Sequence, residues 1–191
     1  LDLGNCRVVA IPDHQVAHIY VNDPALLEED AATLRETEGI THVYTRAEQE
    51  ALGLHHERSG DLIAVSDESS WFTYYYWKSD RKAPDYARCV DIHRKPGYDP
   101  VELFLNPKFW FPKLKVAYRL AKKMLGFRML MDLIPLDATL VKGSHGCIPK
   151  DQADHPVLIG RFSGRENGST IAATDVYEQL LTFCLNTAKR S

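Results

Sequence analysis

The sequence predicts an α/β protein whose first part is a small α+β lobe of ferredoxin-like character. Three strand-like runs alternate with two helix-like runs between Gln15 and Ser66. Each helix-like run begins beside a residue that caps helices and ends near a glycine. This order of elements, over about sixty residues, favours helices packed on one face of a small sheet.

The first predicted strand and helix are separated by a helix-start signal. Residues Gln15–Val21 are rich in β-forming side chains, and Asp23 then caps a helix that has Pro24 at its first position. We expect this helix to end near Glu38, because Gly39 can adopt the left-handed conformation that closes a helix. Its packing face consists of apolar residues at helical spacing, Leu27, Ala31 and Leu34.

The other two strands flank a shorter helix. Thr41–Tyr44 and Leu62–Ser66 are the predicted strands. Between them, Thr45 and Glu48 have the spacing of a capping box, which opens a helix that we expect to end near Gly53.

An aromatic run, Trp71–Trp77, follows the last of these strands. Alternation places aromatic side chains on both sides of an extended chain, which favours a core strand. The alternative is a pocket wall, because aromatic rings also stack on bases and sugars.

The middle of the chain is predicted to contain an amphipathic helix and a buried strand. The helix covers residues 113–125, is closed by Gly126, and is followed by a strand from Phe127 to Ile134. A solvated basic face is favoured over one that binds acidic lipid or RNA, because the net charge of the chain is negative. We expect the inward face to be Val116 or Ala117, Leu120, Ala121 and Met124, and the outward face to be Lys115, Arg119, Lys122 and Lys123.

The tail is predicted to complete the core. Val157–Ile159 is a predicted core strand, and Ala172–Leu185 is a terminal helix with Thr174 as its cap. The face that should close the core is Tyr177, Leu180, Leu181 and Cys184.

Composition excludes several classes of protein. A chain of 191 residues can bury a substantial core, and its net charge of −3 provides no basic surface for duplex nucleic acid. The four cysteines form no Cys-x-x-Cys pair, so free thiols and a cytoplasmic location are the default. No apolar run approaches the roughly 20 residues of a membrane helix.

A histidine between small residues is the strongest local indication of chemistry. In Gly143-Ser-His-Gly146 the glycines allow positive φ and close approach of the backbone to an ion, and the imidazole of His145 is a common ligand of zinc-like metals. The alternative is an ordinary turn without a ligand.

A second polar segment lies between residues 90 and 100. Asp91 and His93 lie on one side of an extended chain, and both suit a metal ion. Arg94 and Lys95 could bind a phosphoryl group, the first with bidentate geometry and the second as a point charge. A plain surface turn is the alternative.

Several of these runs, in this order, resemble the C-terminal half of the type I phosphodiesterases and nucleotide pyrophosphatases of the alkaline phosphatase superfamily. The Gly-Ser-His-Gly run looks like the last metal-ligand histidine loop of that superfamily. The other runs that carry the resemblance are His18–Val21, Gly60–Asp67, Val90–Pro100 and Ala173–Tyr177.

The resemblance implies the C-terminal part of an alkaline-phosphatase-like core with an inserted cap. Residues 1–13 would be the entry strand of the core, residues 14–90 the α+β cap lobe, and residues 91–191 the metal-binding part of the core. The cap would lean over the active site and shape the substrate pocket.

The resemblance also implies a cofactor of two divalent metal ions, usually zinc. His145 would ligate one ion, with His93, Asp91 and His14 as further candidates, and Lys142 would join Arg94 and Lys95 on the phosphate side. Asp13-His14 resembles the Asp-His-Gly ligand pair of the family, although Gln15 stands where that motif has glycine.

The expected function is part of a metal-dependent phosphoester hydrolase acting on a phosphate-ester or nucleotide-like small molecule. The threonine or serine nucleophile of the family has no counterpart in this sequence, so this chain alone should be inactive and should need an N-terminal half as its partner. The alternative from another class is a non-catalytic module that binds a small molecule or a protein.

Overall fold

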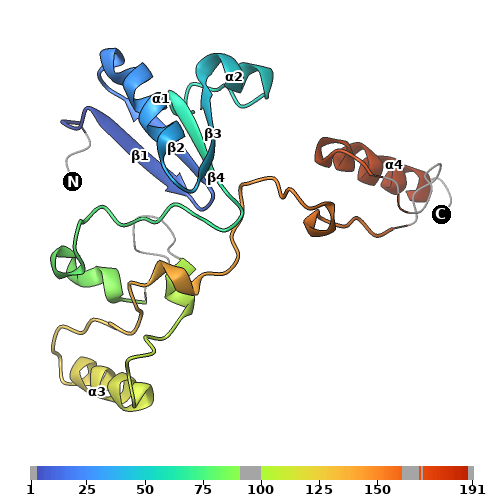
Figure 1. The fold of residues 1–191 in the computed structure, drawn as a ribbon. Helices are drawn as coiled ribbons and strands as arrows, with labels where there is room; N and C mark the ends of the chain where they lie inside the picture. The colour runs from blue at the N-terminus through green and yellow to red at the C-terminus, as the bar shows by residue number, and fades with distance from the viewer. Residues whose placement is uncertain (1–3, 91–99, 161–167, 169, 189–191) are drawn as a thin grey trace. The chain divides into compact units, whose positions relative to one another are not determined.

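The computed structural model of the chain describes residues 4–90, 100–160, 168 and 170–188. The chain divides into two units, Leu1–Ile148 and Pro149–Ser191. The first unit carries the sheet and the second carries the last helix (Figure 1).

Four strands form an antiparallel sheet in the first unit, in the order β1-β2-β4-β3 (Figure 1). Strand β4 lies between β2 and β3 and is antiparallel to both, so β2 and β3 point the same way, as in a split βαβ unit. The small mixed α/β arrangement is therefore confirmed. The strands are β1 (Val8–Asp13), β2 (Val16–Val21), β3 (Ile40–Thr45) and β4 (Leu62–Ser66).

Strand β1 was expected to enter a separate core, but it belongs to this sheet. It forms a hairpin with β2 in which Asp13 lies opposite Val16, so the turn consists of His14 and Gln15. The insertion of this lobe as a cap, with boundaries at residues 13 and 90, stays a prediction.

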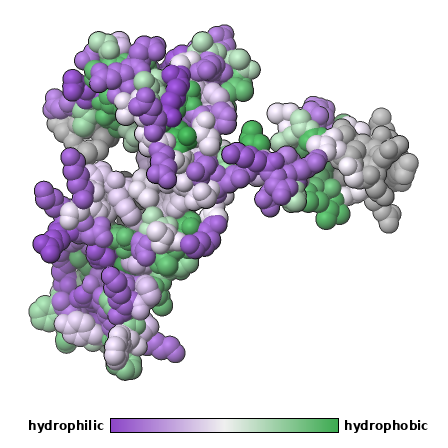
Figure 2. All heavy atoms as spheres, viewed as in Figure 1, coloured by the Kyte–Doolittle hydropathy of each residue, from purple (hydrophilic) through white to green (hydrophobic). Residues whose placement is uncertain are grey.

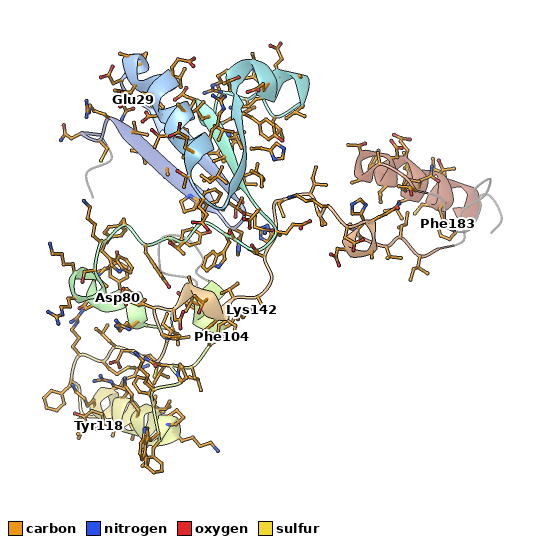
Figure 3. The ribbon with its side chains drawn as sticks, viewed as in Figure 1. Glu29, Asp80, Phe104, Tyr118, Lys142 and Phe183 are labelled. Atoms are coloured by element: carbon orange, nitrogen blue, oxygen red, sulfur yellow. The ribbon has the colours of Figure 1, made fainter. Side chains whose placement is uncertain are left out.

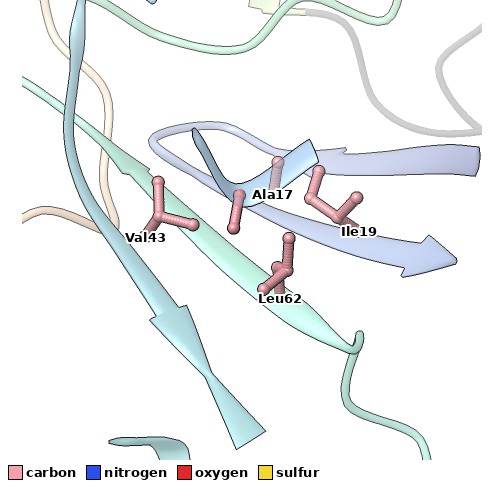
Figure 4. Packing of buried hydrophobic residues seen from close by; sticks show 5 residues of the cluster. Ala17, Ile19, Val43 and Leu62 are labelled. Carbon is pink, nitrogen blue, oxygen red and sulfur yellow. The ribbon is translucent and has the colours of Figure 1, made fainter. Parts of the chain in front are cut away.

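Helix α1 (Leu27–Glu36) supplies the packing face that its sequence predicts. A 3-10 turn, Pro24–Leu26, precedes it, and the Asp23 carboxylate accepts a hydrogen bond from the Ala25 amide at 3.2 Å. The helix ends two residues earlier than expected, and Gly39 has a φ of +86°. Leu27 and Leu34 pack on a buried cluster, parts of which are seen in Figure 4, that comprises Ala17, Ile19, Ala31, Val43 and Leu62.

Helix α2 (Arg46–Ala51) begins at the predicted capping box. The Glu48 carboxylate accepts hydrogen bonds from the Thr45 amide at 2.7 Å and from the Thr45 hydroxyl at 2.8 Å. These two bonds hold the pKa of Glu48 below its ordinary value. The predicted start of this helix is thereby confirmed.

The described residues of the first unit form no further strand after β4, which corrects two predictions. Trp71–Trp77 forms no strand; Tyr75 and Trp77 stack on each other with ring centroids 4.9 Å apart. Phe127–Ile134 makes only an isolated bridge, from Asp132 to Cys89, among the described residues. Apolar side chains on both sides of a segment indicate burial or ring contacts, and they do not specify a partner strand. Short 3-10 helices lie at Asp80–Lys82, Asp85–Arg88, Pro100–Leu103 and Ala138–Leu140.

Helix α3 (Pro112–Met124) is close to its predicted bounds but is turned the other way. Lys115 and Arg119, which were expected to face solvent, are about three-quarters buried against Asp132. Leu120 and Met124, which were expected inside, are 46% and 88% exposed. Apolar atoms are seen at the surface around this helix in Figure 2, and Figure 3 labels its Tyr118.

The orientation of α3 follows from one carboxylate. The Arg119 guanidinium donates to both Asp132 oxygens, at 2.7 and 2.8 Å, and the Lys115 ammonium lies 3.3 Å from the same carboxylate. Burial raises the pKa of Asp132, but the hydrogen bonds from Arg119 and Lys115 outweigh it and lower this pKa overall. The buried face of α3 is therefore the one that carries the bidentate contact and not the apolar face that its sequence pattern favours.

The second unit contains the predicted terminal helix, α4 (Val176–Ala188). Thr174 was expected to cap this helix. It lies instead within the 3-10 turn Ala173–Asp175 that precedes α4. The predicted strand Val157–Ile159 is wrong, because the structure assigns these described residues to no strand. A further 3-10 turn lies at Gln152–Asp154, and the face predicted to close the core, Tyr177, Leu180, Leu181 and Cys184, lies on α4, where its packing on the core stays a prediction.

All four cysteines are free thiols. None of the helices within the described ranges combines the length and the apolar character that crossing a bilayer requires.

Candidate metal-binding site

The hairpin turn and the loop that carries His145 meet in the first unit. Asp13 is the last residue of β1, His14 opens the turn, and His145 follows the 3-10 turn Ala138–Leu140. One potential ligand atom from each of the three residues lies within 4.8 Å of the other two. The two imidazole ring centroids are 4.0 Å apart, with their planes tilted by 41°. These residues are far apart in the sequence but form one cluster of metal-binding side chains.

The conformation of His14 is set by the tight turn. Its φ is +57°, a left-handed value that two-residue hairpin turns require and that histidine tolerates better than most residues. Its Nδ1 lies 3.0 Å from the Ser144 hydroxyl, in hydrogen-bonding contact across 130 positions of sequence. Such a bond through one ring nitrogen orients an imidazole for ligation.

The loop after Ser144 approaches the hairpin closely at Gly146. The Gln15 amide donates to the His145 carbonyl at 2.9 Å. Gly146 has a φ of +120°, and a Cβ at this position would lie 2.9 Å from Val16 Cγ2 and 3.3 Å from the Gln15 carbonyl carbon. Glycine is therefore required here both for its backbone conformation and for the close contact.

A groove with a volume of about 500 Å³ lies beside the cluster. Its lining includes Ser144, whose hydroxyl contacts His14, and Lys142, which is labelled in Figure 3. The remaining lining residues are Gln15, Glu68, Ser69, Ser70, Trp71, Ala138, Thr139, Val141 and Gly143.

Hydroxyl groups give the groove its polar character. Ser69 donates to Asp67 at 2.9 Å, and Thr139 donates to Asp137 at 2.6 Å. Hydrogen bonds from Ser70 and Ser69 lower the pKa of Asp67, and hydrogen bonds from Thr139 lower that of Asp137. Because these hydroxyl protons are directed to carboxylates, the hydroxyl oxygens remain acceptors for a ligand.

The structure brings only some of the predicted site residues together. His14 and His145 share the cluster, and Lys142 lines the groove. Asp91, His93, Arg94 and Lys95 lie outside the described residues. Gln15 and Ser144 were not singled out as site residues, and no local pattern marks them, because their importance comes from contacts between distant segments.

The fold and the cluster define a mixed α/β protein with a candidate metal centre, and sequence comparison gives its family. A profile described as type I phosphodiesterase / nucleotide pyrophosphatase matches residues 1–99, just over half of the chain. The chain therefore belongs to the type I phosphodiesterase and nucleotide pyrophosphatase family. No protein of curated function matches the chain.

A solved structure is also similar to part of the chain. It is phosphonoacetate hydrolase from Sinorhizobium meliloti 1021 in complex with phosphonoacetate, which is 26% identical over 36% of this chain. The alignment spans 20% of that enzyme, with a TM-score of 0.32. The similarity thus concerns about a fifth of the enzyme and carries no conclusion about the whole fold.

Proposed function

We propose that Asp13, His14 and His145 bind a divalent metal ion and that the chain forms part of a metal-dependent phosphoester hydrolase of its family. The observation that carries this proposal is the clustering of a carboxylate and two imidazoles within 4.8 Å. Membership of the family supports the reaction class.

The donor set fits a zinc-like ion. Two imidazoles and one carboxylate are borderline ligands, and three protein ligands with an open position are typical of catalytic zinc. A bound ion of this kind would supply Lewis acidity and would lower the pKa of a bound water. The second ion of the family would need further ligands, for which Asp91 and His93 remain the proposed residues.

The groove suits the substrate of such a site. We assign the Lys142 ammonium to the phosphoryl group, with Arg94 and Lys95 as further cations, because ammonium and guanidinium groups bind phosphate oxygens. The acceptor hydroxyls of Ser69 and Thr139 would face the group esterified to the phosphate. The substrate class is therefore a phosphate ester whose organic part carries hydrogen-bond donors, as nucleotide-like molecules do.

Because the sequence contains no counterpart of the family's nucleophile, the 191-residue chain by itself should not turn over. The cytoplasmic location stays a prediction.

Calorimetric titration with zinc tests the metal site. The chain should bind zinc, and His145→Ala should weaken binding at least tenfold, because one of three ligands is lost. His42→Ala is the matched control, since His42 is exposed and stacks on Tyr44 away from the cluster. Absence of zinc binding by the parent, or equal affinity in all three proteins, would contradict the proposal. A protein that includes the nucleophile decides between the enzyme and the non-catalytic module. If it binds metal and ligand but does not hydrolyse a phosphate ester, the non-catalytic module is favoured.

A further inference from the structure

We infer that Gln15 is a positioning residue that holds the His145 loop on the hairpin turn and thereby sets the metal affinity of the site. The part that concerns metal affinity rests on the proposed function. The positioning itself depends on contacts within the protein alone.

The burial of Gln15 is unusual for its place in the chain. It is the second residue of a hairpin turn, where polar side chains normally reach solvent, yet it is only 5% exposed. Its amide nitrogen donates to the carbonyls of Asp67 and Ser70, at 3.2 Å each. The side chain therefore ties the turn to the segment that follows β4.

The same residue also reaches the His145 loop. The amide oxygen of Gln15 accepts a hydrogen bond from the Cys147 thiol at 3.3 Å, and its backbone amide donates to the His145 carbonyl at 2.9 Å. Its backbone carbonyl accepts from the Ser66 amide at 2.9 Å. The side chain and backbone of Gln15 thus join the hairpin turn, the end of β4 with the segment that follows it, and the His145 loop.

Gln15 lies beside one proposed metal ligand and forms hydrogen bonds close to another. It follows His14 directly, and Cys147 lies two residues after His145. Glycine at position 15, as in the Asp-His-Gly pattern, could make the backbone bonds but none of the side-chain bonds. The amide group of Gln15 therefore restricts the relative movement of two proposed ligands. Loss of a group that bonds a ligand directly weakens metal binding about 10- to 100-fold, and we expect the lower end of this range for Gln15, whose side chain acts through Cys147.

Gln15→Met removes the amide and keeps the length of the side chain. Gln49→Met is the matched control, because Gln49 is also buried and its side-chain amide donates to backbone carbonyls, among them those of Tyr44 and Gly60 at 3.2 and 3.1 Å. Both variants should unfold at a lower temperature than the parent. Only Gln15→Met should alter the loop at residues 141–147.

The experiment combines zinc titration with amide hydrogen exchange of residues 141–147. Gln15→Met should bind zinc about tenfold more weakly and exchange faster in this loop, whereas Gln49→Met should match the parent within about twofold on both measures. Equal behaviour of the two variants would overturn the inference. If the parent binds no zinc, the proposed function is wrong, and hydrogen exchange alone decides whether Gln15 positions the loop.

A milder pair of variants serves if Gln15→Met does not fold. Cys147→Ala removes only the donor to the Gln15 amide oxygen, and Cys147→Ser retains a donor. Faster exchange of the loop in Cys147→Ala, restored in Cys147→Ser, supports the inference. Parent-like exchange in both variants overturns it.

Discussion

At the scale of single residues, the candidate site depends on backbone conformations that few side chains allow. His14 and Gly146 both have positive φ, one in the hairpin turn and the other in the His145 loop. Each is located where the two segments approach each other. The site therefore forms where the hairpin turn and the His145 loop, each with one residue of positive φ, lie in contact.

Replacement of Gly146 by alanine tests this point. The added Cβ would require Val16 to move, and the alanine would have to adopt a left-handed backbone conformation. Together these effects cost about 1–3 kcal/mol when the His145 loop contacts the hairpin. We expect zinc binding about 5- to 150-fold weaker by calorimetry, since 1.4 kcal/mol corresponds to a factor of about ten. Gly143→Ala is the control, because a Cβ there meets no atom within 4 Å; an equal loss in both variants would contradict this explanation.

At the scale of elements, helix α3 shows that a short ionic contact can decide which face of a helix is buried. The apolar side chains of α3 indicate a helix and give its bounds closely. They do not indicate which face of α3 is buried. That face is set by Asp132, which lies outside the helix and forms ion pairs with Lys115 and Arg119. Helix α1 buries the predicted Ala31 and α2 begins at its predicted capping box, because these signals lie within or directly beside each helix.

Asp132→Asn should loosen α3. Loss of the charge should cost about 1–2 kcal/mol at pH 7, a value reduced by solvent screening of the partly exposed cluster. Because the folded-state pKa of Asp132 is lowered, its contribution is present above the unfolded pKa of about 3.9 and is lost as pH falls through the folded value.

Urea denaturation at pH 7 and at a pH below the lowered folded-state pKa of Asp132 measures this difference. Parent and variant should differ in free energy of unfolding at pH 7 and converge at the acidic pH. Asp85→Asn serves as control, because the Asp85–Arg128 pair is mostly exposed and should matter little. A gap of the same size at both pH values would count against the ionic explanation.

At the scale of the whole molecule, stability and the site are linked through the sheet of the first unit. Strand β4 pairs with β2 on one side and with β3 on the other, and β2 begins directly after the turn that carries His14. Packing in the core therefore supports the hairpin from which the site projects.

Leu62→Ala should destabilise the sheet that supports the hairpin. Leu62 is fully buried in the cluster of Figure 4, and truncation of such a side chain costs about 2–5 kcal/mol. Leu52→Ala, at a residue that is 53% exposed, should change the unfolding free energy little. Urea denaturation compares them, and similar losses in both would show that the cluster is not the stabilising core.

The sequence by itself determined the local elements between Val16 and Ser66, because capping residues, glycines and apolar spacing act within a few positions of one another. It also indicated His145 as a candidate ligand from the residues beside it. Tertiary structure alone decided the contact of His14 with the His145 loop, the burial of Gln15 and the orientation of α3. Each of these depends on groups distant in the chain, 130 positions in the case of His14 and Ser144, and local periodicity carries no information about which distant segments meet.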